Sequence, residues 1–262
     1  MSEPFFPRLN INEVLDNLSF NKFVNLCSDL TPNPQVKESP KEIFKGIKDL
    51  NWYYPEENSK PNPNIFFKEL TLNSPESSAF IIDGGGTALY AGFQSSHIKE
   101  GQRIICSSAI SAMGTGLAEV VGVHNAEEFK KLFCIIGDGS FLMNIQDLQT
   151  IKSQKIPVII SVINNNGYLA IRHTQSEFLS GKLYGTHPDW SLEMPSIEKL
   201  AKGFDIPFCK LDNKKDTEEI IGKLLNSDGP VICEVVVDED AQELFKQGYK
   251  SNEDGTFSIS HK

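Results

Sequence analysis

From about residue 64 onward, short apolar runs alternate with longer stretches of helical periodicity. Short runs rich in Ile, Val, Leu and Cys, each bounded by turn residues, predict strands at Ala79–Ile82, Arg103–Cys106, Leu132–Ile136, Val158–Ile163, Pro207–Leu211 and Val231–Val237. Helices are predicted between most of them, at Thr87–His97, Met113–Val123, Phe141–Ser153, Ser196–Phe204 and Thr217–Asn226. Near-continuous apolar strands separated by helices are typical of a parallel sheet that is covered on both faces. We therefore predict an α/β fold with a doubly wound, mainly parallel six-stranded sheet and helices on both faces.

Residues 1–60 have a different texture. Apolar positions within 11–24 follow helical spacing, and a short helix is predicted over 41–50. The stretches 31–40 and 53–64 are rich in proline, asparagine and charge, which is typical of linkers and irregular surface. We therefore divide the chain into a helical and linker segment, residues 1–60, and an α/β domain, residues 61–262.

The charge balance narrows the classes of ligand. The 262 residues include 35 acidic and 25 basic side chains, a formal net charge of -10. This balance argues against non-specific binding to nucleic acid or to an anionic membrane, since both require a basic face. An anionic ligand therefore needs local help from a cation or from oriented backbone amides.

The cysteines and the N-terminal residues indicate the cellular compartment of the protein. The five cysteines form no CxxC pair, and four of them lie in apolar runs, so we interpret them as small buried hydrophobic residues in a reducing environment. No basic start followed by an apolar stretch is visible, and no run approaches the roughly 18 apolar residues of a membrane span. We expect a cytoplasmic protein without membrane contact.

A glycine-rich motif with one carboxylate follows the strand predicted at Leu132–Ile136. Its residues are Gly137, Asp138, Gly139 and Ser140, and a helix comes next. Glycines allow close approach of the backbone to a ligand, and a helix N-terminus offers amides to an anion. Asp138 would repel a phosphate unless a divalent cation lies between them. Alternatively, Asp138 only caps the helix.

The next predicted strand ends in Asn164, Asn165, Asn166, Gly167 and Tyr168. If the two strands are neighbours in a parallel sheet, their carboxyl ends meet, and this turn lies beside the glycine-rich motif. Asparagine offers a neutral oxygen that suits Mg²⁺ alongside one carboxylate and phosphate oxygens. Asn-rich strand ends are also ordinary turns. The combination of both motifs at two strand ends is more specific than either alone.

Together, these motifs resemble the diphosphate–magnesium motif of enzymes that depend on thiamine diphosphate (ThDP). Residues 137–168 resemble the acetolactate synthase-like branch in particular, and the resemblance extends over roughly residues 60–250, the C-terminal cofactor-binding domain of that family. It implies Mg²⁺ ligands from the side chains of Asp138 and Asn165 and from the carbonyl of Gly167. The residues it places around the cofactor are Gly86, Thr87, Ser111, Met113, Gly137, Gly139, Ser140, Asn165, Gly167, Tyr168 and Leu169.

Two further loops agree with the resemblance. Met113 matches the position where the family supports the bent cofactor with a bulky apolar side chain, although it is also suited to filling the core. Ser111 would offer its carbonyl to the aminopyrimidine, at a position where relatives often carry glycine. Gly86 and Thr87 fall where the family touches the diphosphate from another strand end, or form only a turn.

The resemblance implies an enzyme acting on 2-keto acids by decarboxylation or carboligation, a transferase or lyase. In this family a glutamate of a separate pyrimidine-binding domain activates the cofactor, and no such domain precedes residue 60. We therefore assign no catalytic residue to this chain and expect that glutamate from another chain, in a homodimer or hetero-oligomer. The chain is then either one subunit of a split enzyme or a fragment that cannot turn over alone. Residues 1–60 are a candidate tail of a missing central domain, and no flavin is expected.

Two other classes of function remain as alternatives. One is a non-catalytic relic or assembly partner that still binds ThDP. The other is a nucleotide-binding doubly wound domain, which is disfavoured because the sequence contains neither a GxGxxG motif after a first strand nor a Walker lysine.

The substrate side is less well defined by the sequence. Acetolactate synthases carry a tryptophan in the helix after the motif, and this position is Thr174 here, which argues against strict acetolactate synthase specificity. Arg172 and His173 could face the carboxylate of a keto acid, or lie on a solvated helix face. His187 and Asp189 lie in a loop to which we assign no role.

Overall fold

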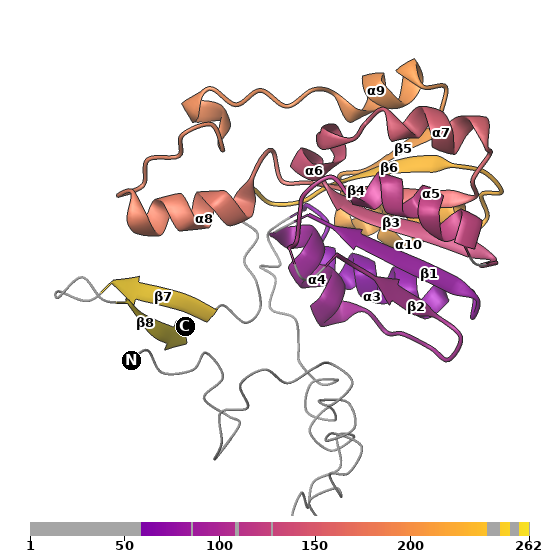
Figure 1. Cartoon of the computed structure of the whole chain (residues 1–262), viewed down its shortest axis with the longest axis horizontal. Helices are drawn as coiled ribbons and strands as arrows, with labels where there is room; N and C mark the ends of the chain where they lie inside the picture. Colours follow the sequence, from indigo (N-terminus) through magenta and orange to yellow (C-terminus); the bar gives the residue numbers. More distant parts are fainter. Residues whose placement is uncertain are drawn as a thin grey trace, which may run out of the picture. The chain divides into compact units, whose positions relative to one another are not determined.

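The computed structural model describes residues 59–84, 86–107, 110–126, 128–239, 247–251 and 257–261. The predicted helices and linkers before residue 59 lie outside this part, so the division at residue 60 stays a prediction. Within the described part, six strands form one parallel sheet in the order β2-β1-β3-β4-β6-β5 (Figure 1). Their bounds are β1 Ser78–Asp83, β2 Arg103–Ile105, β3 Lys131–Gly137, β4 Val158–Asn164, β5 Phe208–Leu211 and β6 Val231–Val236. The predicted fold class is confirmed.

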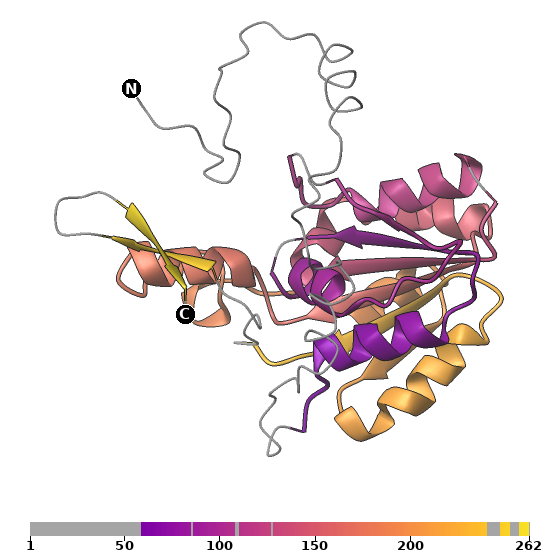
Figure 2. The ribbon, with the colours of Figure 1, turned by 90° about the horizontal axis from the view of Figure 1, so that it is seen from below.

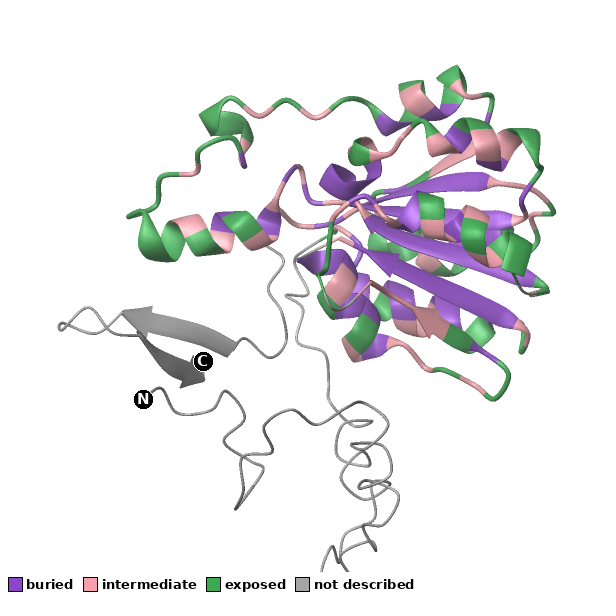
Figure 3. Ribbon diagram, in the orientation of Figure 1, coloured by how far each residue is buried: buried purple, intermediate pink, exposed green. Residues whose placement is uncertain are grey.

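Helices cover both faces of this sheet (Figure 2). One face packs against α3 (Pro63–Asn73), α4 (Thr87–Ser95) and α10 (Thr217–Leu225) through a core that includes Phe66, Ala88 and Ile221. The other face packs against α5 (Gly116–Ala126), α6 (Asp138–Met143), α7 (Asp147–Ser153) and α9 (Ile197–Gly203). The four central strands β1, β3, β4 and β6 are buried along almost their whole length (Figure 3), which explains their lack of apolar/polar alternation.

The central position of β3 and β4 builds the site. The two strands are parallel neighbours, and their register pairs Gly137 with Ile163. Asp138 directly follows β3 and Asn165 directly follows β4, so both emerge at the same edge of the sheet. This adjacency, which the sequence analysis assumed, is confirmed.

Several predicted boundaries were wrong for local reasons. The helix predicted at Phe141–Ser153 is two helices, because Asn144 leaves helical geometry with φ -131° and ψ 39°. The helix predicted from Met113 begins at Gly116, since Gly114 has a φ of +89°. A two-stranded antiparallel sheet, formed by β7 (Gln247–Ser251) and β8 (Phe257–His261), was not predicted at all.

Candidate functional site

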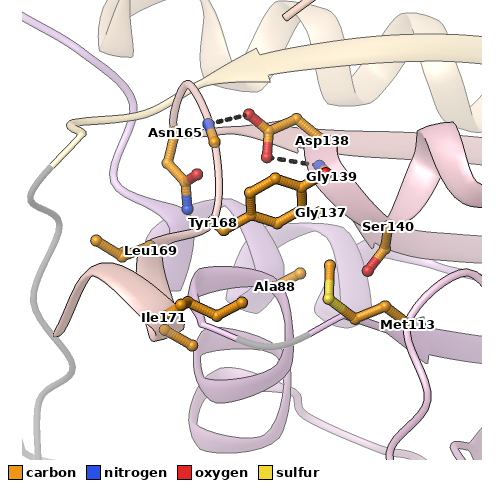
Figure 4. Close-up of a pocket in the computed structure, with 12 residues that line it drawn as sticks. Ala88, Met113, Gly137, Asp138, Gly139, Ser140, Asn165, Tyr168, Leu169 and Ile171 are labelled. Carbon is orange, nitrogen blue, oxygen red and sulfur yellow. Dashed lines mark hydrogen bonds between the residues drawn. The ribbon is translucent and has the colours of Figure 1, made fainter. Parts of the chain in front are cut away.

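A hollow at the carboxyl ends of β3 and β4 collects most of the residues singled out in the sequence (Figure 4). Three loops that are far apart in the chain meet there, together with the start of α8 (Leu169–Phe178). The lining residues are Ala88, Met113, Gly137, Asp138, Gly139, Ser140, Asn165, Gly167, Tyr168, Leu169, Ala170 and Ile171. The glycine-rich motif and the asparagine turn therefore form one site, as their spacing predicted.

Asp138 is a buried carboxylate, only 2% exposed. Its Oδ1 accepts a hydrogen bond from the Gly139 amide and its Oδ2 one from the Gly167 amide, both at 2.8 Å. Burial raises its pKa to about 7, although these amides and the nearby Arg172 oppose the rise. No ion pair to Asp138 is found among the described residues. An ionised carboxylate here is therefore short of positive charge, which a bound cation would supply.

Asn165 has one amide atom engaged and the other without a partner. Its Nδ2 donates to Oγ1 of Thr87 at 3.2 Å, which fixes the orientation of the amide. Its Oδ1 is buried and has no hydrogen-bond partner within the described part of the chain, and the same holds for Oγ of Ser140. Leaving a buried acceptor without a partner costs about 1–3 kcal/mol, so such atoms usually mark a ligand, an ion or water.

Gly167 can only be glycine in this arrangement. Its φ is +132°, and a Cβ built on it would lie 2.6 Å from Cδ2 of Leu192 and 2.7 Å from the carbonyl oxygen of Thr186. The segment around these two residues lies directly on the turn, because the Tyr168 amide also donates to the Thr186 carbonyl at 3.4 Å. The backbone of the turn is thereby held in one conformation.

Tyr168 lies over the glycine-rich motif, with its ring crossing the hollow beside Gly139 (Figure 4). A Cβ on Gly139 would come within 2.4 Å of Cε1 of this ring. The glycine therefore makes room for an aromatic side chain beside the glycine-rich motif.

The loop that carries Met113 is held by a residue that the sequence analysis missed, Asp83 at the end of β1. Its Oδ2 accepts hydrogen bonds from the amides of Gly114 at 3.0 Å and Gly116 at 2.8 Å. Asp83 is 3% exposed, and burial raises the pKa of its carboxyl while these amides oppose the rise. An acidic residue at the end of an apolar strand was the available signal.

Asp83→Ala should lower the free energy of unfolding by about 2–4 kcal/mol, because two buried amides lose their acceptor. Asp83→Asn should lose less, since it keeps a carbonyl oxygen. The pKa of the folded carboxyl is raised, so the wild type loses stability relative to the asparagine variant as the pH rises above the unfolded pKa. Urea unfolding at pH 5 and pH 8 measures both effects. Equal stability of the two variants would contradict this role.

The remaining predicted cofactor residues lie around the hollow rather than in its lining. Gly86 precedes α4 with a φ of +64°, and Thr87 directs its hydroxyl to Asn165. Ser111, with a φ of +52°, belongs to a neighbouring hollow that also includes Asp83 and Cys106. Thr87 thus contacts a predicted ligand of the metal directly.

Both interpretations of Arg172 were wrong. This side chain is 3% exposed, and its guanidinium binds backbone carbonyls rather than facing solvent or the hollow. Thr174 is exposed on α8. His187 accepts a hydrogen bond from the Asp189 amide at 3.2 Å through Nδ1, and its Nε2 lies 3.6 Å from Oε2 of Glu239. His187 therefore connects its loop to the chain after β6.

The donor set fits a cation beside a polyanion. A buried carboxylate without an ion pair and a fixed amide oxygen without a partner are hard oxygen ligands, which Mg²⁺ prefers. Open parallel sheets bind ligands at this edge, where phosphorylated cofactors commonly sit. Fold and site together define an α/β domain of the cofactor-binding class.

Comparison with known proteins identifies the family. Residues 84–235 match the family described as thiamine pyrophosphate enzyme, C-terminal TPP binding domain. The chain therefore belongs to this family, the C-terminal cofactor-binding domain of ThDP-dependent enzymes, and the resemblance to the acetolactate synthase-like branch is confirmed. ThDP is the cofactor of this family, with Mg²⁺ as its partner metal in this domain.

The relatives are considerably longer than the chain. It is 29% identical over 189 residues to the acetolactate synthase isozyme 2 large subunit of Escherichia coli K12, covering 72% of the chain and 34% of that protein. It is 33% identical over 150 residues to the acetolactate synthase large subunit of Porphyra purpurea, covering 56% of the chain and 25% of that protein. The chain thus spans about a third or less of these proteins.

A solved structure shares the fold. It is the ThDP-dependent 4-hydroxybenzoylformate decarboxylase of Rhodococcus jostii RHA1, with a TM-score of 0.61 and 23% identity over 71% of the chain and 34% of that structure. Among the described helices, none is long and apolar enough to span a membrane.

Proposed function

We propose that this chain binds Mg²⁺ and ThDP as the cofactor-binding part of an acetolactate synthase-like enzyme. The side chains of Asp138 and Asn165 and the carbonyl of Gly167 are the proposed ligands of the metal. The observation that carries the proposal is the Oδ1 of Asn165, which is fixed in place and has no partner among the described residues, in the same hollow as the buried Asp138 carboxylate. One carboxylate and one amide leave coordination positions for phosphate oxygens and water, as Mg²⁺ sites on phosphorylated ligands usually do.

Other residues of the hollow are suited to the rest of the cofactor. Gly139 and Ser140 begin α6, and the hydroxyl of Ser140 has no partner within the described part, so both are proposed to bind the diphosphate. Met113 lies on the opposite wall from Asn165 (Figure 4), where its apolar side chain would support the bent cofactor. When bound, ThDP supplies a C2 carbanion that attacks a 2-keto acid and stabilises the charge left after decarboxylation.

The proposed substrates are 2-keto acids, and the proposed partner is a chain carrying the pyrimidine-binding domain with the activating glutamate. The names of the relatives, which are large subunits of acetolactate synthase, support a substrate of this class and a further subunit. An exposed apolar residue of the hollow supports it too, because Ile171, which lines the hollow, is 44% exposed. Apolar side chains beside a ligand site suit a second domain or a second chain.

The test begins with the purified full chain. Mg²⁺ and ThDP together are expected to raise its melting temperature, whereas ThDP with a chelator is not, because the metal links the diphosphate to Asp138. Absence of any shift would overturn the proposed function. Decarboxylation of pyruvate is then measured with and without a pyrimidine-domain chain encoded beside it.

We expect activity only with that partner chain. Robust turnover by the pure chain would contradict the divided site. A third outcome is possible, in which the chain binds the cofactor and the partner chain but the mixture shows no activity. This result would favour the non-catalytic relic or assembly role.

A further inference from the structure

We infer that Arg172 is a positioning residue, which holds the Asn165–Gly167 turn in the shape that Mg²⁺ requires and ties this turn to the chain after β6. The inference rests on the proposed function, since it concerns the same metal. Arg172 is a buried cation that belongs to neither sequence motif and does not line the hollow. The inference gives this side chain a role.

The contacts of Arg172 connect two separate segments. Its Nη2 donates to the carbonyl of Asn165 at 2.9 Å and to the carbonyl of Glu239 at 2.8 Å, while Nη1 lies 3.5 Å from the carbonyl of Asn166. The side chain is 3% exposed. A planar guanidinium can bind several carbonyls at fixed angles, whereas a lysine ammonium is a single point charge on a flexible stem.

These contacts determine which oxygens of the turn remain available. The carbonyls of Asn165 and Asn166 accept hydrogen bonds from the guanidinium, so they are engaged there rather than offered to a metal. The next carbonyl along the chain belongs to Gly167, the proposed backbone ligand. Arg172 thereby selects one carbonyl of the three, and it does so from beneath the turn without touching the hollow, which it does not line.

The rest of the turn is fixed by contacts that converge on the same segment. Asn166 has a φ of +60°, its amide donates to Oδ1 of Asn164 at 2.9 Å, and its Nδ2 donates to Oε1 of Glu239 at 2.8 Å. Glu239 also faces His187 through its other carboxylate oxygen. Arg172 and Glu239 together therefore connect the metal turn, α8 and the loop around His187.

A purely structural role and a positioning role predict different results with two metals. Mg²⁺ demands near-ideal octahedral geometry at about 2.0–2.1 Å, whereas Ca²⁺ accepts six to eight oxygens at variable angles. A displaced Gly167 carbonyl should therefore weaken Mg²⁺ binding more than Ca²⁺ binding. General loosening of the fold should weaken the binding of both metals by the same factor.

The experiment compares wild type, Arg172→Lys, Arg172→Met and the matched control Lys131→Met, all as the full chain. Lys131 is another buried cation that binds a backbone carbonyl, that of Ser227, but it lies at the opposite end of β3. Calorimetric titration with MgCl₂ and with CaCl₂, each at a fixed ThDP concentration, gives the two apparent affinities. Urea unfolding without metal gives the stability of each variant.

Both Arg172 variants are expected to lose about tenfold or more in Mg²⁺ affinity, the usual effect of removing a residue that orients metal ligands, and clearly less in Ca²⁺ affinity. Lys131→Met should lose stability with little change in either affinity. If Arg172→Met does not fold, Arg172→Lys decides, because it keeps the charge but cannot bridge two segments.

Equal losses for both metals, or no loss, would overturn the inference while leaving the proposed function intact. Failure of the wild type to bind Mg²⁺ with ThDP would overturn the proposed function itself, and the inference with it.

Discussion

Asp138→Asn is expected to abolish the stabilisation of the chain by Mg²⁺ and ThDP, and at the same time to make the cofactor-free chain more stable at neutral pH. The wild-type carboxylate is the only proposed ligand with a formal charge, so its loss removes the main attraction for the cation. Saturation at about one hundred times the dissociation constant stabilises a protein by about 2.7 kcal/mol, which corresponds to a shift of several degrees in melting temperature. The variant should show no such shift.

The higher stability expected for the cofactor-free Asp138→Asn variant follows from the pKa of the wild-type carboxyl. Burial raises the pKa of Asp138 from 3.8 to about 7 in the folded chain. The folded state therefore binds the proton more tightly than the unfolded state, and stability falls as the pH rises from about 4 to above 7. The difference between the two pKa values sets an upper bound of about 4 kcal/mol on this loss in the free energy of unfolding. Asp138→Asn should lack this pH dependence and exceed the wild type in stability above pH 7.

The measurements are urea unfolding of the metal-free chain between pH 4 and 8, and thermal unfolding with Mg²⁺ and ThDP. Asp212→Asn is a suitable control, because this carboxylate is 60% exposed at the end of β5. It should leave both the cofactor response and the pH dependence unchanged. A variant at Asp138 that still responds to Mg²⁺ would show that the metal lies elsewhere.

Gly167→Ala should destabilise the chain by about 2–5 kcal/mol, because a methyl group there combines backbone strain with a steric clash. The φ of +132° is unfavourable for alanine, and the new Cβ would lie within 2.7 Å of Leu192 and Thr186. Relief of the clash requires the turn to move, which displaces the Gly167 carbonyl. Mg²⁺-dependent binding of ThDP should therefore fall as well.

Gly181→Ala separates the effect of backbone strain from the effect of the steric clash. Gly181 also has a positive φ, +78°, but a Cβ on it meets nothing within 4 Å. This variant should lose about 1–2 kcal/mol from backbone strain alone and keep its cofactor response. Equal losses at the two glycines in urea unfolding would contradict the clash.

Several features of the site could not be predicted because they depend on contacts between distant segments. Arg172 follows the asparagine turn by a few residues, yet its burial depends on Glu239, which follows β6. The role of Asp83 requires the loop of Gly114 to fold over the end of β1. Neither residue belongs to a motif with characteristic spacing, so the sequence pattern does not show which groups they bind.

The six strands of the parallel sheet, its two helical layers and the two motifs that meet in the site all follow from the sequence pattern, whereas the β7–β8 pair does not. Buried parallel strands must be apolar along their whole length, and glycine and asparagine at their ends mark turns, so both leave a local signal. The family resemblance turned these motifs into ligand assignments for Asp138 and Asn165.

Which atoms of the site remain available to a ligand depends on the tertiary structure. Thr87 accepts a hydrogen bond from the Asn165 side-chain nitrogen and leaves Oδ1 without a partner in the described part of the chain, while Arg172 binds two carbonyls of the turn. Hydrogen bonds between segments far apart in the chain set that availability, and they exist only once the sheet has brought those segments together.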